Sequence, residues 1–299
     1  MQKIDKFKYL PFGDGQPFQL RMGLQPLPPE QWIEIGDDYA AQLAEKRRLL
    51  AARHGDVFQA LPESRTASDE ALQLLLEHLR TFHADHFAID GTKLRNIQTG
   101  EIWDIENSPL HPLEQAGRLV QEDFCILQSD GAHYLLTAGS VCFPSNWRLA
   151  DKIGRKLAEV HGPVPGYADR LERPVDRFFA NLQADTIMWR ANWLIHTTPA
   201  LFQVAHAPTT ETITSSNAGE KLWLRAERQT LHRLPESGAV LFTIRTHLAQ
   251  LGQAICSRKS AQDLATAVRT MPDAVLHYRR LHAVRPALLD WLEAQAAHS

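Results

Sequence analysis

Residues 160–167 read VHGPVPGY and place one histidine among two glycines and two prolines. Before them, residues 147–160 carry apolar side chains at helical spacing, which predicts a helix. His161 comes four residues after Leu157, so a helix continued by one residue puts both side chains on the same apolar face. Gly162 can end that helix, and the prolines fix the exit of the chain because their rings lock φ. The pattern predicts an imidazole held rigidly at a helix end and directed into apolar surroundings.

Two kinds of histidine fit this description. A haem iron is bound by a neutral imidazole nitrogen with a fixed direction in a dry pocket, which makes His161 a candidate metal ligand. A buried histidine that is hydrogen-bonded to a backbone carbonyl has the same surroundings and needs no cofactor. The pattern of residues by itself favours the second interpretation and leaves the first one open.

Strands are predicted where apolar and polar residues alternate in the second half of the chain, at residues 186–196, 221–234 and 239–248. The link Pro-Glu-Ser-Gly at 235–238 predicts a hairpin turn between the last two strands. An earlier pair of strands is predicted within residues 123–145, joined by a turn at Asp130 and its neighbours.

Charged side chains occupy the centres of these strands, and they are the second set of candidate functional residues. Alternation places Arg225 and Glu227 on one face of their strand and Arg228 on the other, while Arg190 and Arg245 lie on the flanking strands. Charges between tryptophan and leucine residues are costly in free energy unless they are paired or functional. They could therefore line a pocket. The alternative is an antiparallel sheet with one solvated face, whose charges form cross-strand pairs.

Other chemical motifs are weaker. His83 and His86 are three residues apart near a helix end, but no carboxylate pattern completes a metal site. Cys142 reads as a small core residue rather than as a nucleophile. The sequence contains no G-x-S-x-G, P-loop or G-x-G-x-x-G motif.

Composition narrows the class of protein. The 299 residues carry a formal net charge of −3 with mixed signs throughout, so no basic footprint for nucleic acid is present. The three cysteines are far apart and form no C-x-x-C pair, which favours a reduced compartment and argues against a zinc or iron–sulfur site made by this chain alone. The first fifteen residues have no apolar signal region, and no apolar run approaches membrane length. We therefore expect a soluble cytoplasmic protein.

The order of the predicted elements gives an α+β fold, with an antiparallel sheet and helical additions at both ends. Residues 1–100 are expected to hold an extended arm and two helices, at 39–53 and at 68–83 with Ser68 as N-cap. Residues 101–255 form the predicted core, in which Ser145 caps the helix that leads to His161. Residues 256–299 are predicted to form two helices, the first capped by Ser260 and the second interrupted or kinked by Pro286. The three parts are expected to make one compact domain.

Three long stretches carry a resemblance to a known family. The stretches VCFPSNWRLADKIGRKLAEVHGPVPGY, MWRANW and LWLRAERQTLHRLPESGAVLFTIRTHL resemble the α subunits of haem-dependent oxidative N-demethylases. The resemblance covers about residues 10 to 255 and is strongest over 120–250. It implies a PAS-like haem domain, in which haem b lies between an antiparallel sheet and helices that pack on one face. It also implies oxidation of a small secondary amine such as dimethylamine by O₂. NADPH supplies the electrons there, and the flavin and iron–sulfur sites belong to partner subunits.

The resemblance assigns roles to the candidate residues. His161 becomes the proximal haem ligand, and Arg190, Arg225, Glu227 and Arg228 become candidates for the distal pocket or the haem propionates. We take Arg225, Glu227 and Arg190 as candidate catalytic residues, and Arg228 with Arg245 as candidate cofactor-binding residues beside His161. A strand arginine would stabilise negative charge on oxygen, and Glu227 would hold a protonated amine.

Two other functions are compatible with the same scaffold. PAS domains commonly sense gases or redox state, but this chain shows no output domain or long coiled-coil linker. A haem-free protein that binds a small ligand is the third possibility. A visible spectrum separates the haem-free protein from the other two, and a substrate screen with a reductase separates the enzyme from the sensor.

Overall fold

The computed structural model describes residues 7–205 and 211–298 of the chain. Its centre is a seven-stranded antiparallel sheet with the strand order β1-β8-β9-β10-β6-β7-β2. In that order the strands are β1 (Gln25–Leu27), β8 (Ile187–His196), β9 (Trp223–Arg233), β10 (Val240–Gln250), β6 (Asp123–Ser129), β7 (Tyr134–Ser140) and β2 (Phe58–Ala60). The predicted strands and both predicted hairpin turns are confirmed. An antiparallel α+β fold is therefore confirmed as well.

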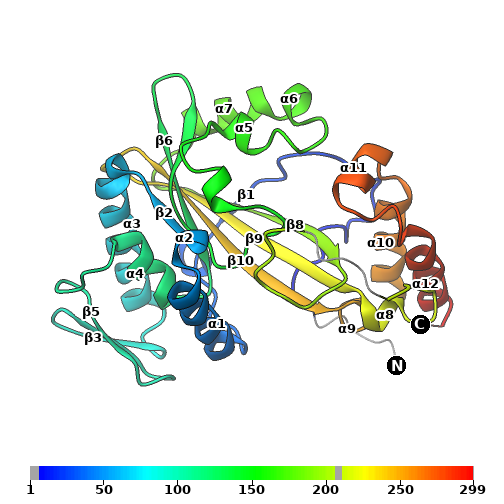
Figure 1. The fold of residues 1–299 in the computed structure, drawn as a ribbon, viewed down its shortest axis with the longest axis horizontal. Helices are drawn as coiled ribbons and strands as arrows, with labels where there is room; N and C mark the ends of the chain where they lie inside the picture. The colour runs from blue at the N-terminus through cyan, green and yellow to red at the C-terminus, as the bar shows by residue number, and fades with distance from the viewer. Residues whose placement is uncertain (1–6, 206–210, 299) are drawn as a thin grey trace.

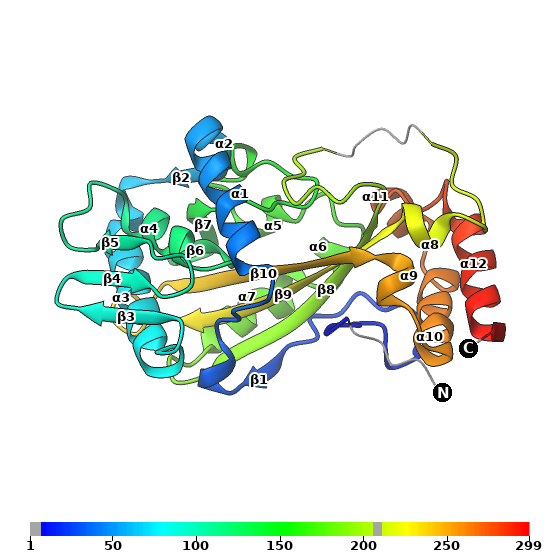
Figure 2. The same cartoon turned by 90° about the horizontal axis from the view of Figure 1, so that it is seen from below.

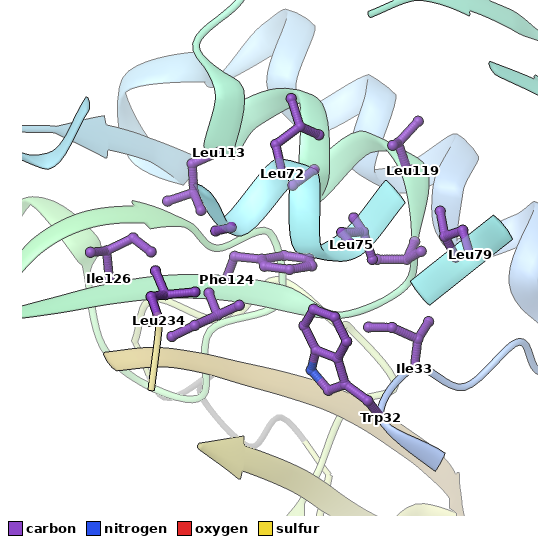
Figure 3. Packing of buried hydrophobic residues seen from close by; sticks show 14 of the residues in the cluster. Trp32, Ile33, Leu72, Leu75, Leu79, Leu113, Leu119, Phe124, Ile126 and Leu234 are labelled. Atoms are coloured by element: carbon purple, nitrogen blue, oxygen red, sulfur yellow. The ribbon is translucent and has the colours of Figure 1, made fainter. Parts of the chain in front are cut away.

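The sheet has two covered faces. The face that packs on the N-terminal helices is called the second face, and the face under the short helices of residues 157–181 is called the first face. Phe124, Ile126 and Leu241 point to the second face and share a buried cluster with Leu75 and Leu113. Figure 3 shows how Leu75 and Leu113 approach Phe124 and Ile126 across the helix–sheet boundary. The helices are α1 (Tyr39–Ala52), α2 (His54–Val57), α3 (Arg65–Phe82) and α4 (Pro112–Leu119).

The first face carries Cys125, Leu127 and Leu231, which cluster with Leu157 and Phe179. These last two residues belong to the short helices α5 (Leu157–Val160) and α7 (Glu172–Asn181), and α6 (Tyr167–Arg170) lies between them in the chain. Figure 1 shows α5, α6 and α7 above the sheet and α1, α3 and α4 below it. Helices therefore cover both faces: α5–α7 of the predicted core cover the first face, and α1, α3 and α4 cover the second.

The predicted helix over residues 147–160 is wrong. Only a 3₁₀ turn, Leu149–Asp151, and the four residues of α5 are helical there. Gly154 adopts a φ of 74°, and its N–H donates to the Leu136 carbonyl at 2.7 Å. Hydrogen bonding to β7, at a position outside its pairing with β2, therefore replaces the middle of the helix. Ser145 is not a helix cap, because its hydroxyl donates to Glu227 instead.

The other helix ends depart from the sequence prediction by a few residues. Helix α3 starts at Arg65, so Ser68 is a buried interior residue and not the cap. The N-cap of α10 (Arg258–Arg269) is Ser257, whose hydroxyl accepts from the Ser260 N–H, so Ser260 is the reciprocal partner within the helix. A third C-terminal helix, α11 (Asp273–Tyr278), lies before α12 (Arg285–His298). Pro286 starts α12, where its missing N–H costs nothing, and does not kink it.

The remaining elements extend the fold at its ends. A second sheet has the order β3-β4-β5 (Phe87–Asp90, Lys93–Asn96, Ile102–Asp104). Short helix α8 (Ala218–Lys221) comes directly before β9, and α9 (Leu251–Ala254) follows β10. Both lie at the end of the sheet beside α10 and α12, as Figure 2 shows. The sheet also takes β1 and β2 from the first hundred residues. Within the described residues, no helix combines the length and apolar character needed to cross a bilayer.

Candidate functional site

His161 lies directly after α5, and its tautomer is set by the backbone. Its Nδ1 is 2.9 Å from the Leu157 carbonyl oxygen, and its own N–H donates to the same oxygen at 3.0 Å. A carbonyl oxygen accepts hydrogen bonds only, so Nδ1 must carry the proton. Nε2 is then left with its lone pair, which is the state in which a histidine binds a metal ion. The hydrogen bond to a backbone carbonyl that is expected of a buried histidine without a cofactor is thus present. The same bond leaves Nε2 ready to bind a metal ion.

The chain after His161 holds the ring in place. The His161 and Tyr167 rings are stacked, with their centroids 4.7 Å apart and their planes 10° from parallel. The Val164 N–H donates to the His161 carbonyl at 2.8 Å. Gly166 has a φ of 78°, a left-handed conformation that glycine adopts at little cost. The predicted stiffness of this segment is therefore supported by its contacts.

The surroundings of His161 keep it neutral near pH 7. Burial is the main cause of a fall in its pKa to about 4, and the positive charges of Lys152 and Arg190 lower it further. The hydrogen bond to Leu157 opposes this fall but does not cancel it. Arg190 on β8 therefore acts electrostatically on the imidazole.

The candidate residues of β8 and β9 meet on the first face. The strands pair so that Arg190 lies opposite Gln229 and Asn192 lies opposite Glu227. Directly opposed residues of an antiparallel pair project to the same side of the sheet. Arg190, Arg225 and Glu227 are therefore together on the side that α5–α7 cover.

Glu227 is 8% exposed and is held on three sides. Its Oε1 accepts from the Ser145 hydroxyl, and its Oε2 accepts from Gln229 Nε2 at 3.1 Å. The Nε of Arg225 is 3.6 Å from Oε1. Because these groups fix the carboxylate, it can present a defined negative charge to a small cation.

Arg225 is fully buried, and its guanidinium joins three segments of the chain. It donates to the Phe143 carbonyl, to the Leu201 carbonyl at 3.0 Å, and to the Thr246 hydroxyl at 3.4 Å. These bonds tie two loops to the sheet beneath Glu227. The geometry gives Arg225 the contacts of a residue that positions Glu227 and the loops.

Arg190 has a different environment. Its Nε is buried and has no hydrogen-bond partner within the described part of the chain. Burial lowers its pKa, and the charge of Glu227 raises it in part. A buried guanidinium with an unused donor is costly unless an acceptor arrives from outside the chain. Arg190 is thus suited to bind an anionic or oxygen-bearing group.

Arg228 and Arg245 lie on the second face, opposite one another in the β9–β10 pair. Arg228 donates to the carbonyls of Gln31 and Trp32. Arg245 donates to Asp38 and to Gln42, each at 2.8 Å. The structure does not bring these two arginines together with His161. Their contacts attach the N-terminal segment to the sheet.

Two functional candidates were missed by the sequence analysis. Asn146 has a φ of 61°, which is uncommon for a residue other than glycine, and its Oδ1 is buried without a partner among the described residues. It follows Ser145, the residue that bonds to Glu227. Arg279, at the end of α11, donates to the Trp193 carbonyl at 2.5 Å and lies 5.0 Å from the centre of the Trp193 ring. Both depend on contacts between distant segments, and no local sequence signal indicates them.

The weaker candidates, Cys142 and the pair His83 and His86, have the contacts of structural residues and not of a nucleophile or a metal site. Burial raises the pKa of the Cys142 thiol to about 12, so the thiol stays protonated. His83 is half-buried, its buried Nε2 has no hydrogen-bond partner in the described structure, and its ring centroid is 6.2 Å from that of His86. Across residues 7–205 and 211–298, no group of three or more His, Cys, Asp or Glu side chains is arranged to hold a metal ion.

Fold and site together define a class: an α+β protein that holds a neutral histidine over an antiparallel sheet with buried arginines and one fixed carboxylate. Residues 23–289 match the family model described as haem-dependent oxidative N-demethylase, alpha subunit-like. Since this match spans most of the chain, the protein belongs to that family.

Proposed function

We propose that this chain is the haem-binding subunit of an oxidative N-demethylase and that His161 binds the haem iron. The observation that carries the proposal is the hydrogen bond from Nδ1 to the Leu157 carbonyl, which leaves Nε2 with a free lone pair. A family name that includes haem dependence supports it. We further propose that the central sheet with α5–α7 is the PAS-like haem unit.

The residues near His161 fit a haem group. Half-buried apolar side chains adjoin the buried cluster of the first face and would contact an apolar macrocycle; they include Trp147, Ile153, Met188 and Phe242. The unpartnered Nε of Arg190 would meet a propionate or an oxygen ligand. Haem b, when bound, would supply the O₂-dependent oxidation that turns an N-methyl group into formaldehyde and leaves the demethylated amine.

The protein side chains would orient the substrate. Glu227 would accept a charge-assisted hydrogen bond from the protonated amine, and Arg225 would keep Glu227 in place. Asn146 could accept a second hydrogen bond from the amine through its unused Oδ1. Arg190 would stabilise negative charge that develops on oxygen.

Electrons would come from partner subunits. The sequence has no dinucleotide fingerprint and no cysteine cluster, so NADPH, flavin and iron–sulfur centres are assigned to a reductase partner. The α-subunit-like family description supports the presence of such partners. We expect the chain alone to show no turnover with NADPH.

The test is a titration of the haem-free protein with haemin, followed by the Soret band. His161→Ala should abolish the ligated spectrum while the far-UV circular dichroism stays near that of the wild type. Added imidazole should restore much of that spectrum, because it can replace the missing ring. His133→Ala, in the β6–β7 turn, is the matched control and should bind haemin normally. Unchanged ligation in His161→Ala would refute the assignment.

A second measurement separates the enzyme from a sensor. The haem-loaded protein is mixed with a chemical or enzymatic reductant, O₂ and small N-methyl amines, both with and without a carboxylate group, and formaldehyde is quantified. Amine-dependent formaldehyde that disappears in Glu227→Gln supports the demethylase. Stable O₂ binding without any formaldehyde would refute it.

A further inference from the structure

A cavity of about 240 Å³ lies along the edge of β8. Strand β1 pairs with β8 only as far as Trp189, so the edge of β8 beyond that residue has no strand neighbour among the described residues. The extended N-terminal arm passes over this edge, and α10 and the end of α11 close the other side. The lining includes Arg190, Asn192, Trp193 and Arg279.

Some charged side chains that line the cavity have an ion-pair partner, and others have none. Arg21 and Asp14 also line it, but they form an ion pair with each other at 2.8 Å and are largely exposed. Arg190 and Arg279 form no ion pair with any carboxylate in the described structure. The carboxylate whose charge acts on both is Glu227, which already contacts Ser145, Gln229 and Arg225. Two half-buried positive charges therefore remain without a carboxylate partner among the described residues.

Burial confirms that these charges are costly. It lowers the pKa of Arg279 to about 10 and also lowers the pKa of Arg190. Arg279 is held by the Trp193 carbonyl, by the Trp193 and Phe18 rings, and by Asn192 Oδ1 at 3.4 Å. These neutral partners fix its direction without neutralising it. An anion that entered the cavity would supply the missing charge.

The cavity adjoins the proposed haem site. Arg190 lines the cavity and also acts on His161. Asn192 lines the cavity and lies opposite Glu227 in the sheet. On the arm side, a Cβ placed on Gly166 would be 3.6 Å from Leu20, so the arm touches the loop that follows His161. A small molecule could therefore reach Arg190 and Arg279 at one end and approach Glu227 at the other.

We propose that this cavity binds a carboxylate and that the amine oxidised by this protein is an N-methyl amino acid. The second part rests on the proposed function. The carboxylate would lie on Arg190 and Arg279, whose planar guanidinium groups match a carboxylate in two-point hydrogen bonding. The ammonium group would lie toward Glu227. A simple methylammonium ion has no negative charge to offer these arginines and is repelled by them.

The size of the cavity agrees with this substrate class. At about 240 Å³ it is smaller than the roughly 300–1,000 Å³ typical of sites for drug-sized ligands. It can hold a molecule of a few non-hydrogen atoms, or the edge of a larger one. A haem propionate is also a carboxylate and could enter the cavity from the proposed haem site. The experiment must therefore distinguish these two sources.

The first arm measures ligand binding by calorimetry to both haem-free and haemin-loaded protein. The probes are N-methylglycine, dimethylamine and acetate. N-methylglycine should bind at least tenfold more tightly than dimethylamine to the haemin-loaded protein. Arg190→Gln and Arg279→Gln should each weaken it by about tenfold to a hundredfold, the usual effect of removing a charged hydrogen bond. Arg21→Gln is the control, because Asp14 already neutralises that arginine, and it should change binding little.

The second arm compares haemin with haemin dimethyl ester, which lacks the propionate charges. Suppose that Arg190→Gln and Arg279→Gln weaken the binding of haemin but not of its dimethyl ester, and that N-methylglycine does not bind. The carboxylate on these arginines then belongs to a haem propionate, and the substrate assignment is overturned. Equal binding of N-methylglycine and dimethylamine also overturns it. A normal Soret band in the same samples shows that the proposed haem function survives either result. Arg279→Lys keeps the charge and, with circular dichroism, excludes misfolding as the cause of lost binding.

Discussion

Replacing Arg225 by methionine tests whether this residue positions the site. Methionine has a similar length but cannot donate hydrogen bonds, so the Phe143 and Leu201 carbonyls and the Glu227 carboxylate lose their shared partner. Breaking a buried ion pair by removing one partner costs about 3–5 kcal/mol. Each orphaned buried acceptor adds to that cost, at about 1–3 kcal/mol. Because Glu227 keeps Ser145 and Gln229, we expect a total near the lower end, about 5 kcal/mol.

That loss is large compared with the roughly 5–15 kcal/mol of a typical folded protein. It should lower the melting temperature by about 10 °C for a chain of this size. The assay is urea denaturation of the haem-free protein followed by circular dichroism, with Arg173→Met on the exposed surface of α7 as the control. That control should stay within about 0.5 kcal/mol of the wild type.

The double variant Arg225→Met/Glu227→Gln tests whether Arg225 and Glu227 depend on each other for stability. Glu227→Gln removes the charge that Arg225 balances, so the two changes together should cost less than the sum of the single changes, by about 1–2 kcal/mol. A loss below about 1 kcal/mol in Arg225→Met, or strict additivity in the double variant, would refute the positioning role. Arg225 would then be free for a direct role toward oxygen or a propionate.

Three further predictions concern acid stability, the second face and the Asn146 loop. The haem-free protein should lose stability as the pH falls from about 6.5 toward 4, because unfolded histidines take up protons that folded His161 and His78, with pKa values of about 4 and about 3, do not. Urea midpoints at several pH values measure this, and His161→Gln should make the dependence shallower. Arg228→Met should reduce stability but leave haemin affinity within about twofold, since Arg228 lies on the opposite face; a large loss of affinity would place the cofactor elsewhere. Asn146→Gly should keep the fold, because glycine accepts positive φ, but should weaken amine binding in spectral titrations; unchanged binding would remove Asn146 from the site.

The sequence determined the strands, the two hairpin turns and the helix Tyr39–Ala52, because local alternation, helical periodicity and turn residues act within a few positions. It also determined that Arg225 and Glu227 share a face, since side chains alternate along a strand. The stiff segment after His161 follows from its prolines and glycines. The long resembling stretches pointed to the family that the chain belongs to.

Only the tertiary structure decided the rest. The predicted helix before His161 is interrupted because Gly154 and Arg155 hydrogen-bond to the edge of β7, a partner that local spacing does not contain. The register of β8 against β9 places Arg190 and Glu227 on the same face, and the charge of Arg190 acts on His161 at the end of α5. Arg279 comes from the C-terminal helices, 86 positions after its partner Trp193 on β8. Such contacts depend on how distant segments pack, so a single sequence names the chemical groups but does not say which of them face one another.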